Sequence, residues 1–310
     1  MGIDRPDDAD TSSDNPADRT SAPANDAQHS GASHLETRYR EEYYHAQKER
    51  ATTATRQEAP ASDTWTETAN LARWMWGEYH RRWPPEEHPP VNRSTDPPGS
   101  WRSDSNRFLD TAANARIEAE CDRIVEREQE KISPAMRDTE NQDPSRHLIG
   151  FEHRRKGRDR IKEKVHDNLN EYSLSLDEAI SFIPDAIRYT FQYEEVRYTQ
   201  GVREDITRLE GQGFTLDKLK NSWSDDQYKG INSQWIERDT GQRFEVQFHT
   251  RISLEAKQLT HDAYARLRTL QTDKFEEMVL EAFQKKVSSE VPIPPGAAEI
   301  PDYKREIDAR

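Results

Sequence analysis

Two carboxylates and a dense run of basic side chains are the parts of this sequence that could do chemistry. Asp185 lies directly before one alternating stretch of the chain, and Glu245 lies within another. Carboxylate oxygens are hard ligands that suit Mg²⁺. A divalent ion flanked by Arg and Lys is suited to phosphoryl transfer, because the transition state carries spread negative charge. Since most acidic residues lie on protein surfaces, the pair has this meaning only if the fold brings the two together.

The basic run contains seven Lys and Arg residues between positions 154 and 164, in a chain whose net charge is −14. If this segment is helical, Lys156, Arg160 and Lys164 share one face, because residues four apart on a helix are neighbours. An ordinary solvated basic helix is the alternative. In so acidic a chain we favour a row of cations that faces phosphates.

Two stretches must position these groups. In residues 187–193 and 244–250 every second side chain is aromatic or aliphatic, which is typical of a strand with one buried face. The opposite face carries Arg188 in the first stretch, and Glu245 and Gln247 in the second. We expect helices under the aromatic face and a cleft over a solvated polar face. An ordinary half-exposed antiparallel sheet would show the same alternation.

The remaining patterns predict an α+β fold with a mixed central sheet flanked by helices. A turn at residues 239–241 predicts a hairpin, and Ser253 is expected to cap the helix that follows it. We expect amphipathic helices at 107–131, 176–182, 202–211, 253–267 and 275–283, and further strands at 214–219 and 228–236.

Composition divides the 310 residues into four parts. Residues 1–60 are acidic and polar with almost no core-forming side chains, which predicts disorder. Residues 61–140 form a helical extension, and its tryptophan-rich region 65–83 needs a surface to pack on. We favour the main domain as that surface over a partner protein. Residues 141–290 hold every candidate site residue, and residues 291–310 are expected to be a proline-rich polar tail.

Composition also excludes several classes of protein. Cys121 is the only cysteine, so no intrachain disulfide can form, which fits a reducing cytoplasm. No stretch approaches the roughly 20 apolar residues that cross a bilayer, so we expect a soluble protein without a membrane contact. The acidic total argues against general affinity for nucleic acid, although it leaves a local site open. The sequence does not indicate an oligomeric state.

Four motifs, taken in order, resemble the synthetase domain of the RelA/SpoT family, which transfers pyrophosphate from ATP to the 3′-hydroxyl of a nucleotide. Arg154-x-Lys156 followed by Arg160 and Lys164 is similar to the ATP-binding motif of that family. The Ile-Pro-Asp-Ala-Ile-Arg segment at 183–188 resembles the one that bears its catalytic Asp.

The other two motifs lie on the acceptor side. The Tyr-Lys-Gly-Ile-Asn segment at 228–232 is similar to a Tyr-Arg-Ser-Leu-His motif whose Tyr stacks on the acceptor base. Residues 245–250 resemble the family's Glu-x-Gln-x-x-Thr strand, and His261 with Tyr264 resembles the His-x-x-Tyr of the next helix. The resemblance covers residues 148–268.

The sequence departs from the family pattern at several positions. Arg160 stands where the family has Ser, Asn232 where it has His, and Gly230 where it has Ser. Asp185 precedes Arg188 by three positions instead of five. A glycine at position 230 is expected to let a larger or differently posed acceptor approach the backbone.

The resemblance implies a nucleotidyltransferase-like synthetase domain with ATP as donor and Mg²⁺ as cofactor. The acceptor stays open between GDP, GTP, ADP, AMP and the 3′ end of tRNA, and a tRNA acceptor would imply a toxin. The roles implied are catalysis by Asp185, Glu245 and Arg188, metal binding by Asp185 and Glu245, ATP binding by Arg154, Lys156, Arg160 and Lys164, and acceptor binding by Tyr228, Lys220, Gln247 and His261.

Two other functions compete with this interpretation. A metal-dependent nuclease would use a Pro-Asp…Glu-x-Lys arrangement, which Pro184, Asp185, Glu245 and Gln247 approach. The Gln in place of Lys and the long interval count against it. A non-catalytic nucleotide-binding module, with the tryptophan-rich region recruiting a partner, is the second alternative.

Overall fold

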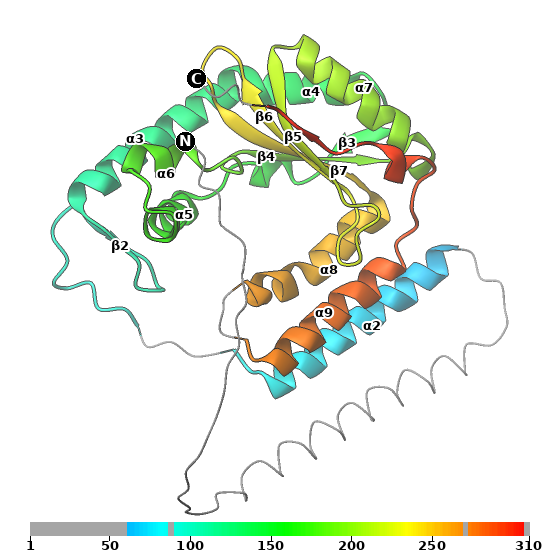
Figure 1. The fold of residues 1–310 in the computed structure, drawn as a ribbon, viewed down its shortest axis with the longest axis horizontal. Coiled ribbons are helices and arrows are strands. Elements are labelled where there is room, and N and C mark those ends of the chain that lie inside the picture. Colours follow the sequence, from blue (N-terminus) through cyan, green and yellow to red (C-terminus); the bar gives the residue numbers. More distant parts are fainter. Residues whose placement is uncertain (1–60, 86–89, 269–271, 307–310) are drawn as a thin grey trace, which may run out of the picture. The chain divides into compact units, whose positions relative to one another are not determined.

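The structure is a computed structural model that describes residues 61–85, 90–268 and 272–306. The predicted disorder of residues 1–60 lies outside the described residues. The compact unit that runs from Ala59 to Arg310 is built around a six-stranded mixed sheet with helices on both sides (Figure 1). This confirms the α+β fold class predicted from the sequence.

The sheet has the strand order β3-β4-β7-β6-β5-β8. Strands β4 and β7 run parallel, and every other neighbouring pair is antiparallel. The predicted hairpin is confirmed, since the turn at 239–241 joins β6 to β7. The bounds are β3 (Arg146–Leu148), β4 (Arg188–Tyr193), β5 (Phe214–Asn221), β6 (Ile231–Glu237), β7 (Arg243–Thr250) and β8 (Tyr303–Lys304), and a separate pair is formed by β1 (Trp101–Arg102) and β2 (Phe108–Leu109).

The last strand falls in the segment expected to be a polar tail. Tyr303 and Lys304 pair with the edge of β5, and Val291, Ala297 and Ile300 before them are buried. The segment therefore contributes to the sheet and the core as far as residue 306, where the described part ends.

One face of the sheet is aromatic and packs on helices, as predicted. Tyr189, Phe191, Phe244 and Phe248 are buried. The helices α4 (Ser133–Asn141) and α7 (Tyr198–Gly211) lie on one side of the sheet, and α8 (Arg251–Leu267) lies on the other (Figure 1).

The opposite face of β7 is not solvated, and here the expectation from alternation is wrong. Glu245, Gln247 and His249 are only 9%, 5% and 0% exposed. Strand β7 lies between β4 and β6, and α8 crosses its polar side. A central strand covered on both faces buries even its polar side chains, which must then find partners within the protein.

Two helix starts also differ from the prediction. Thr250, not Ser253, caps α8, and Ser253 is the third residue of the helix, where it completes a reciprocal capping box with Thr250. The basic run is not one helix, since α5 (Arg158–Glu171) begins only after Gly157. Arg155 and Lys156 run alongside the start of β4: Arg155 forms an isolated antiparallel bridge with Ile187, and the Lys156 N–H donates to the carbonyl of Ala186 over 2.9 Å.

The tryptophan-rich helix α2 (Ala61–Arg82) packs within the chain, as favoured from the sequence. It lies against α8 and α9 (Lys274–Ser289). The Trp65 indole donates to Glu255 over 2.5 Å, and the Tyr79 hydroxyl donates to Glu276 over 2.6 Å. Trp76 stacks on Phe283 of α9 with ring centroids 5.6 Å apart.

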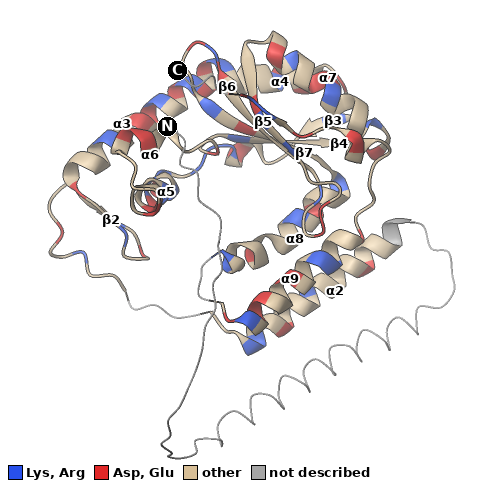
Figure 2. Ribbon diagram, viewed as in Figure 1, with Lys and Arg blue, Asp and Glu red and all other residues tan. Residues whose placement is uncertain are grey.

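The predicted long helix is α3 (Thr111–Arg127), which continues through a π-helical turn (Glu128–Ile132) into α4. Basic and acidic residues alternate along α3 (Figure 2), and Glu120 pairs with Arg116, Arg123 and Arg127. This helix is therefore not a surface of one charge. The short helix α6 (Leu176–Ser181) carries the Ser175 capping box.

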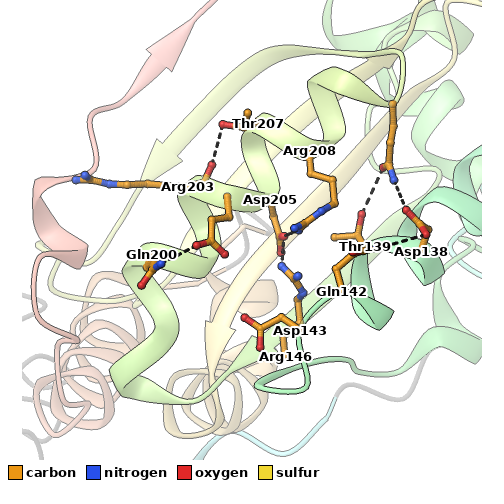
Figure 3. Close-up of polar contacts among 12 residues, drawn as sticks. Asp138, Thr139, Gln142, Asp143, Arg146, Gln200, Arg203, Asp205, Thr207 and Arg208 are labelled. Atoms are coloured by element: carbon orange, nitrogen blue, oxygen red, sulfur yellow. Dashed lines mark hydrogen bonds and ion pairs between the residues drawn. The ribbon is translucent and has the colours of Figure 1, made fainter.

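A buried ion pair ties β3 to α7. The side chains of Arg146 and Asp205 are both 0% exposed and form a direct pair. Arg208 reaches the same carboxylate (Figure 3), and the Tyr193 hydroxyl donates to it over 2.6 Å. Burial raises the pKa of Asp205, and the hydrogen bond from Tyr193 and the charge of Arg146 oppose that rise.

Candidate functional site

Three cations converge on the carboxylate of Asp185. Lys156 reaches Oδ2 at 2.7 Å from the extended segment before α5, and Lys164 reaches Oδ1 at 2.5 Å from the second turn of α5. Arg188, the first residue of β4, donates to Oδ2 at 3.1 Å. The sequence predicted this group, although it placed Lys156 on the helix.

This arrangement fixes the charge of Asp185. Burial acts to raise the pKa of the carboxyl, but hydrogen bonds from Lys156 and Lys164 outweigh it and hold the pKa well below its usual value. The pKa of Lys156 is lowered by burial more than the neighbouring carboxylate raises it. Asp185 is thus an anion at every pH of interest, with its oxygens surrounded by side chains that also bind phosphate.

Glu245 meets the same group from the neighbouring strand. The parallel register places Arg188 of β4 directly opposite Glu245 of β7. The Arg188 Nε lies 3.3 Å from Oε1 of Glu245, so one guanidinium contacts both candidate catalytic carboxylates. The fold therefore brings together two acids that are sixty positions apart in the chain.

A polar chain leads from Glu245 to α8. The amide of Gln247 donates to Oε1 of Glu245, and the ammonium of Lys257 donates to the other end of the same amide. Burial, together with the charge of Arg188, lowers the pKa of Lys257 to about 8 against the opposing effect of Glu245. Sequence reasoning missed Lys257, because only the path of α8 across the sheet brings it to β7.

Tyr228 belongs to a second chain of hydrogen bonds at the other end of β7. Its hydroxyl donates to Oδ1 of Asn232 over 2.9 Å and lies 2.9 Å from Nε2 of His249. Nδ1 of His249 lies 2.9 Å from the Ser253 hydroxyl. Burial raises the pKa of Tyr228, with the charge of Glu245 adding to it, and burial together with Lys257 lowers the pKa of His249.

The lowered pKa keeps His249 neutral, so its ring carries one proton. Because the single hydrogen of the Tyr228 hydroxyl goes to Asn232, the contact between Tyr228 and Nε2 of His249 assigns that ring proton to Nε2 and leaves Nδ1 as the acceptor. What the half-buried Tyr228 can still offer a ligand is its ring.

Gly230 does not open space for a ligand, contrary to the expectation from sequence. A Cβ there would lie 2.7 Å from Cε1 of His249, and the backbone has φ +146°. The imidazole fills the space that the missing side chain leaves.

Four candidate residues form their contacts away from Asp185. Arg154 donates from Nε to buried Glu128 over 2.7 Å and to Ser133 over 3.1 Å. Arg160 lies one turn before Lys164, is mostly exposed and pairs with Glu163. Two more lie on the surface: Lys220 on β5, 3.4 Å from Asp302, and His261 on α8, which is exposed.

The carboxylates also decide which metal the site suits. Among the described residues no group of three or more His, Cys, Asp and Glu is arranged to hold an ion. A site of Asp185 and Glu245 alone fits Mg²⁺, which protein sites commonly bind through one or two carboxylates plus substrate phosphates. It does not fit a structural metal with a full set of protein ligands.

No helix in the described ranges is long and apolar enough to span a bilayer. Cys121 is buried, and burial raises the pKa of its thiol to about 11, so it is not a reactive nucleophile.

Comparisons with known proteins give no matching family model and no matching curated protein. Among solved structures, the small alarmone synthetase 1 from Bacillus subtilis is 17% identical over 57% of this chain and 89% of that one, with a TM-score of 0.39. The same synthetase bound to its product pppGpp matches 44% of this chain and 69% of that one, at 17% identity and a TM-score of 0.33.

A GTP pyrophosphokinase family protein from Streptococcus pneumoniae is 14% identical over 56% of this chain and 89% of that one, with a TM-score of 0.40. These are structures of the kind that the sequence motifs resemble. At identities and TM-scores this low, what the chain does has to be decided from its own side chains.

Proposed function

We propose that this chain transfers the β,γ-diphosphoryl group of ATP to the 3′-hydroxyl of a nucleotide or of a tRNA 3′ end, as alarmone synthetases and related toxins do. The observation that carries the proposal is the convergence of Asp185 and Glu245 on Arg188, with Lys156 and Lys164 on the same carboxylate. Two acids among three cations match a metal–triphosphate substrate in both charge and chemistry.

On the donor side, Asp185 and Glu245 would hold Mg²⁺ together with phosphate oxygens of ATP, and the ion would supply neutralisation of the phosphate charge. Lys156, Lys164 and Arg188 would then donate to the triphosphate. Arg160, exposed one turn before Lys164, is within the same helix face and would reach the outer phosphates. Arg154 would either support the site through its contact with Glu128 or break that contact and bind ATP.

The reaction forms one bond and breaks one. The acceptor 3′-oxygen attacks the β-phosphorus, the bond from that phosphorus to the oxygen bridging to the α-phosphate breaks, and AMP leaves. The hydroxyl proton goes to Glu245, whose Oε2 accepts no hydrogen bond from the described residues, while Arg188 and Gln247 hold Oε1. Lys156 and Arg188 stabilise the charge that develops on the transferring group.

On the acceptor side, Tyr228 would stack on the base. Because its hydroxyl is held by Asn232 and His249, the ring is fixed, and stacking of this kind contributes about 1–3 kcal/mol. Gln247 would position the ribose, and Lys220 and His261 would contact the outer parts of the acceptor. The solved synthetase with bound pppGpp makes guanosine nucleotides the first acceptors to test, and these substrates imply a cytoplasmic reaction.

The test offers ATP labelled at the β- and γ-phosphates to GDP, GTP, ADP, AMP and bulk tRNA in parallel, with Mg²⁺. We expect AMP release together with transfer of label to one class of acceptor. Asp185→Asn and Glu245→Gln should each lower the rate at least about 100-fold while the protein stays folded. The matched control is Asp177→Asn, which removes an exposed carboxylate on α6 that pairs with Arg116 and should keep full activity.

Full activity in Asp185→Asn or Glu245→Gln would contradict the mechanism. Cleavage of DNA or RNA with Mg²⁺ but without ATP would identify a nuclease instead. Binding of ATP without AMP release, whatever the acceptor, would identify a non-catalytic nucleotide-binding module.

A further inference from the structure

Lys257 is a half-buried ammonium at the centre of the polar face, and no described carboxylate forms an ion pair with it. Its one described hydrogen bond goes to the neutral amide of Gln247. Two other covered lysines have an acid: Lys156 has Asp185, and Lys162 has Glu118. Lys229 has no acid but donates to two backbone carbonyls, whereas Lys257 has a single amide oxygen. A covered charge without a counter-charge is costly, which indicates that an anion completes the site when a ligand binds.

The balance of charge around Lys257 points the same way. The connected group contains four cations, Lys156, Lys164, Arg188 and Lys257, against the two carboxylates of Asp185 and Glu245. This local excess lies in a chain whose net charge is −14. The first three cations already contact the acids that would hold the donor, so Lys257 is left for a second anion.

The position of Lys257 indicates which charged group of the acceptor this second anion is. Its partner Gln247 lies in β7 between Glu245, which would receive the proton of the 3′-hydroxyl, and His249, which holds Tyr228. A nucleotide with its base on Tyr228 and its 3′-oxygen at Glu245 has its ribose between them, near Gln247. The charged group carried by that ribose is its 5′-phosphate.

We propose that Lys257 binds the 5′-phosphate of the acceptor nucleotide and so selects acceptors that carry a phosphate there over uncharged nucleosides. The inference rests on the proposed function and adds a specificity-determining residue to it. A free nucleotide presents its ribose 5′-phosphate as a monoester, and the last nucleotide of tRNA presents it as a diester. The assay distinguishes these two acceptors. The lowered pKa of Lys257, about 8, makes this contact sensitive to pH, because the ammonium loses its charge above that value.

The experiment measures acceptor KM and kcat separately for wild type, Lys257→Met and Lys257→Arg. The acceptors are a nucleoside, its 5′-monophosphate and its 5′-diphosphate, with the base that the acceptor screen identifies, and bulk tRNA. We expect Lys257→Met to raise KM for the phosphorylated acceptors about 10- to 100-fold, the loss typical of one hydrogen bond to a charged group. KM for ATP and for the nucleoside should not change, and Lys257→Arg should recover part of the affinity.

The matched control is Lys286→Met, since Lys286 is a similarly exposed lysine on α9 that pairs with Glu290. In wild type, KM for the monophosphate should rise between pH 7 and 9, and in Lys257→Met that rise should be absent. The tRNA arm decides whether the diester is bound as well as the monoester.

Three results would overturn the inference. They are an equal fall in kcat for every acceptor at unchanged KM, a higher KM for ATP, and the same KM for nucleoside and nucleotide in wild type. Calorimetric binding of nucleotide and nucleoside to wild type and Lys257→Gln tests it without turnover. An inactive wild type would therefore refute the proposed function, whereas an unchanged Lys257→Met would refute only this inference.

Discussion

Replacing Gly230 by alanine should both destabilise the protein and weaken the acceptor side of the site. The added Cβ would lie 2.7 Å from Cε1 and 2.9 Å from Nδ1 of His249, and 3.2 Å from the carbonyl oxygen of Phe248. His249 cannot move aside freely, because it is fully buried and its two nitrogens contact Tyr228 and Ser253. The clash must therefore displace the imidazole or the backbone.

The cost has two parts. Holding alanine at φ +146° costs about 1–3 kcal/mol, as for other residues in sparsely populated backbone regions. Forcing a methyl group into a filled site costs about 1–3 kcal/mol more. We therefore expect Gly230→Ala to lower the free energy of unfolding by about 2–6 kcal/mol, the sum of the two.

Urea unfolding measures the total, and a double-mutant cycle separates the parts. In a His249→Ser background the clash with the imidazole is removed, while the backbone strain and the contact with the Phe248 carbonyl remain. Gly230→Ala should therefore cost about 1–2 kcal/mol less there than it does in wild type. The control is Gly211→Ala at the end of α7, where an added Cβ meets no atom within 4 Å. If Gly230→Ala were as stable as Gly211→Ala, neither the contact with His249 nor the positive φ would require glycine at position 230.

Two further predictions concern stability. The pKa of His249 is lowered well below its usual value of 6.5, so below that pH the unfolded chain binds a proton that the folded chain does not, and stability falls with falling pH. Between pH 6.5 and 5.0 wild type should lose about 1.7 kcal/mol more than His249→Asn does, measured by urea unfolding, and parallel curves would contradict the buried neutral imidazole. Asp205→Ala leaves the guanidinium of Arg146 buried without its counter-charge, which should cost about 3–5 kcal/mol. The double variant Arg146→Met/Asp205→Leu should recover much of that loss, and a double variant no better than the single one would show that the pair itself stabilises the fold.

Local patterns in the sequence determined the elements and the identity of the main charged groups. Alternation alone located β4 and β7. In a strand with aromatic side chains at every second position, only one of the two faces can be turned to the core so that these side chains are buried. The residues Asp185, Arg188 and Glu245 could be named because they lie beside or within predicted strands, in segments that resemble motifs of the RelA/SpoT synthetase domain. The hairpin at 239–241 followed from turn residues whose preferences are local.

What the tertiary structure decided is which polar groups meet and which face is covered. The burial of Glu245 and Gln247 depends on α8 crossing β7. The sequence predicts a helix after this strand, but the residues of the strand do not predict that the helix folds back across it. For the same reason Lys257 appears in the site only through the fold, and Arg154 leaves it for Glu128 on the π-helical turn. Sequence periodicity specifies the side of an element on which a residue lies. The partner on that side is set by packing between distant segments, which the pattern within one segment does not contain.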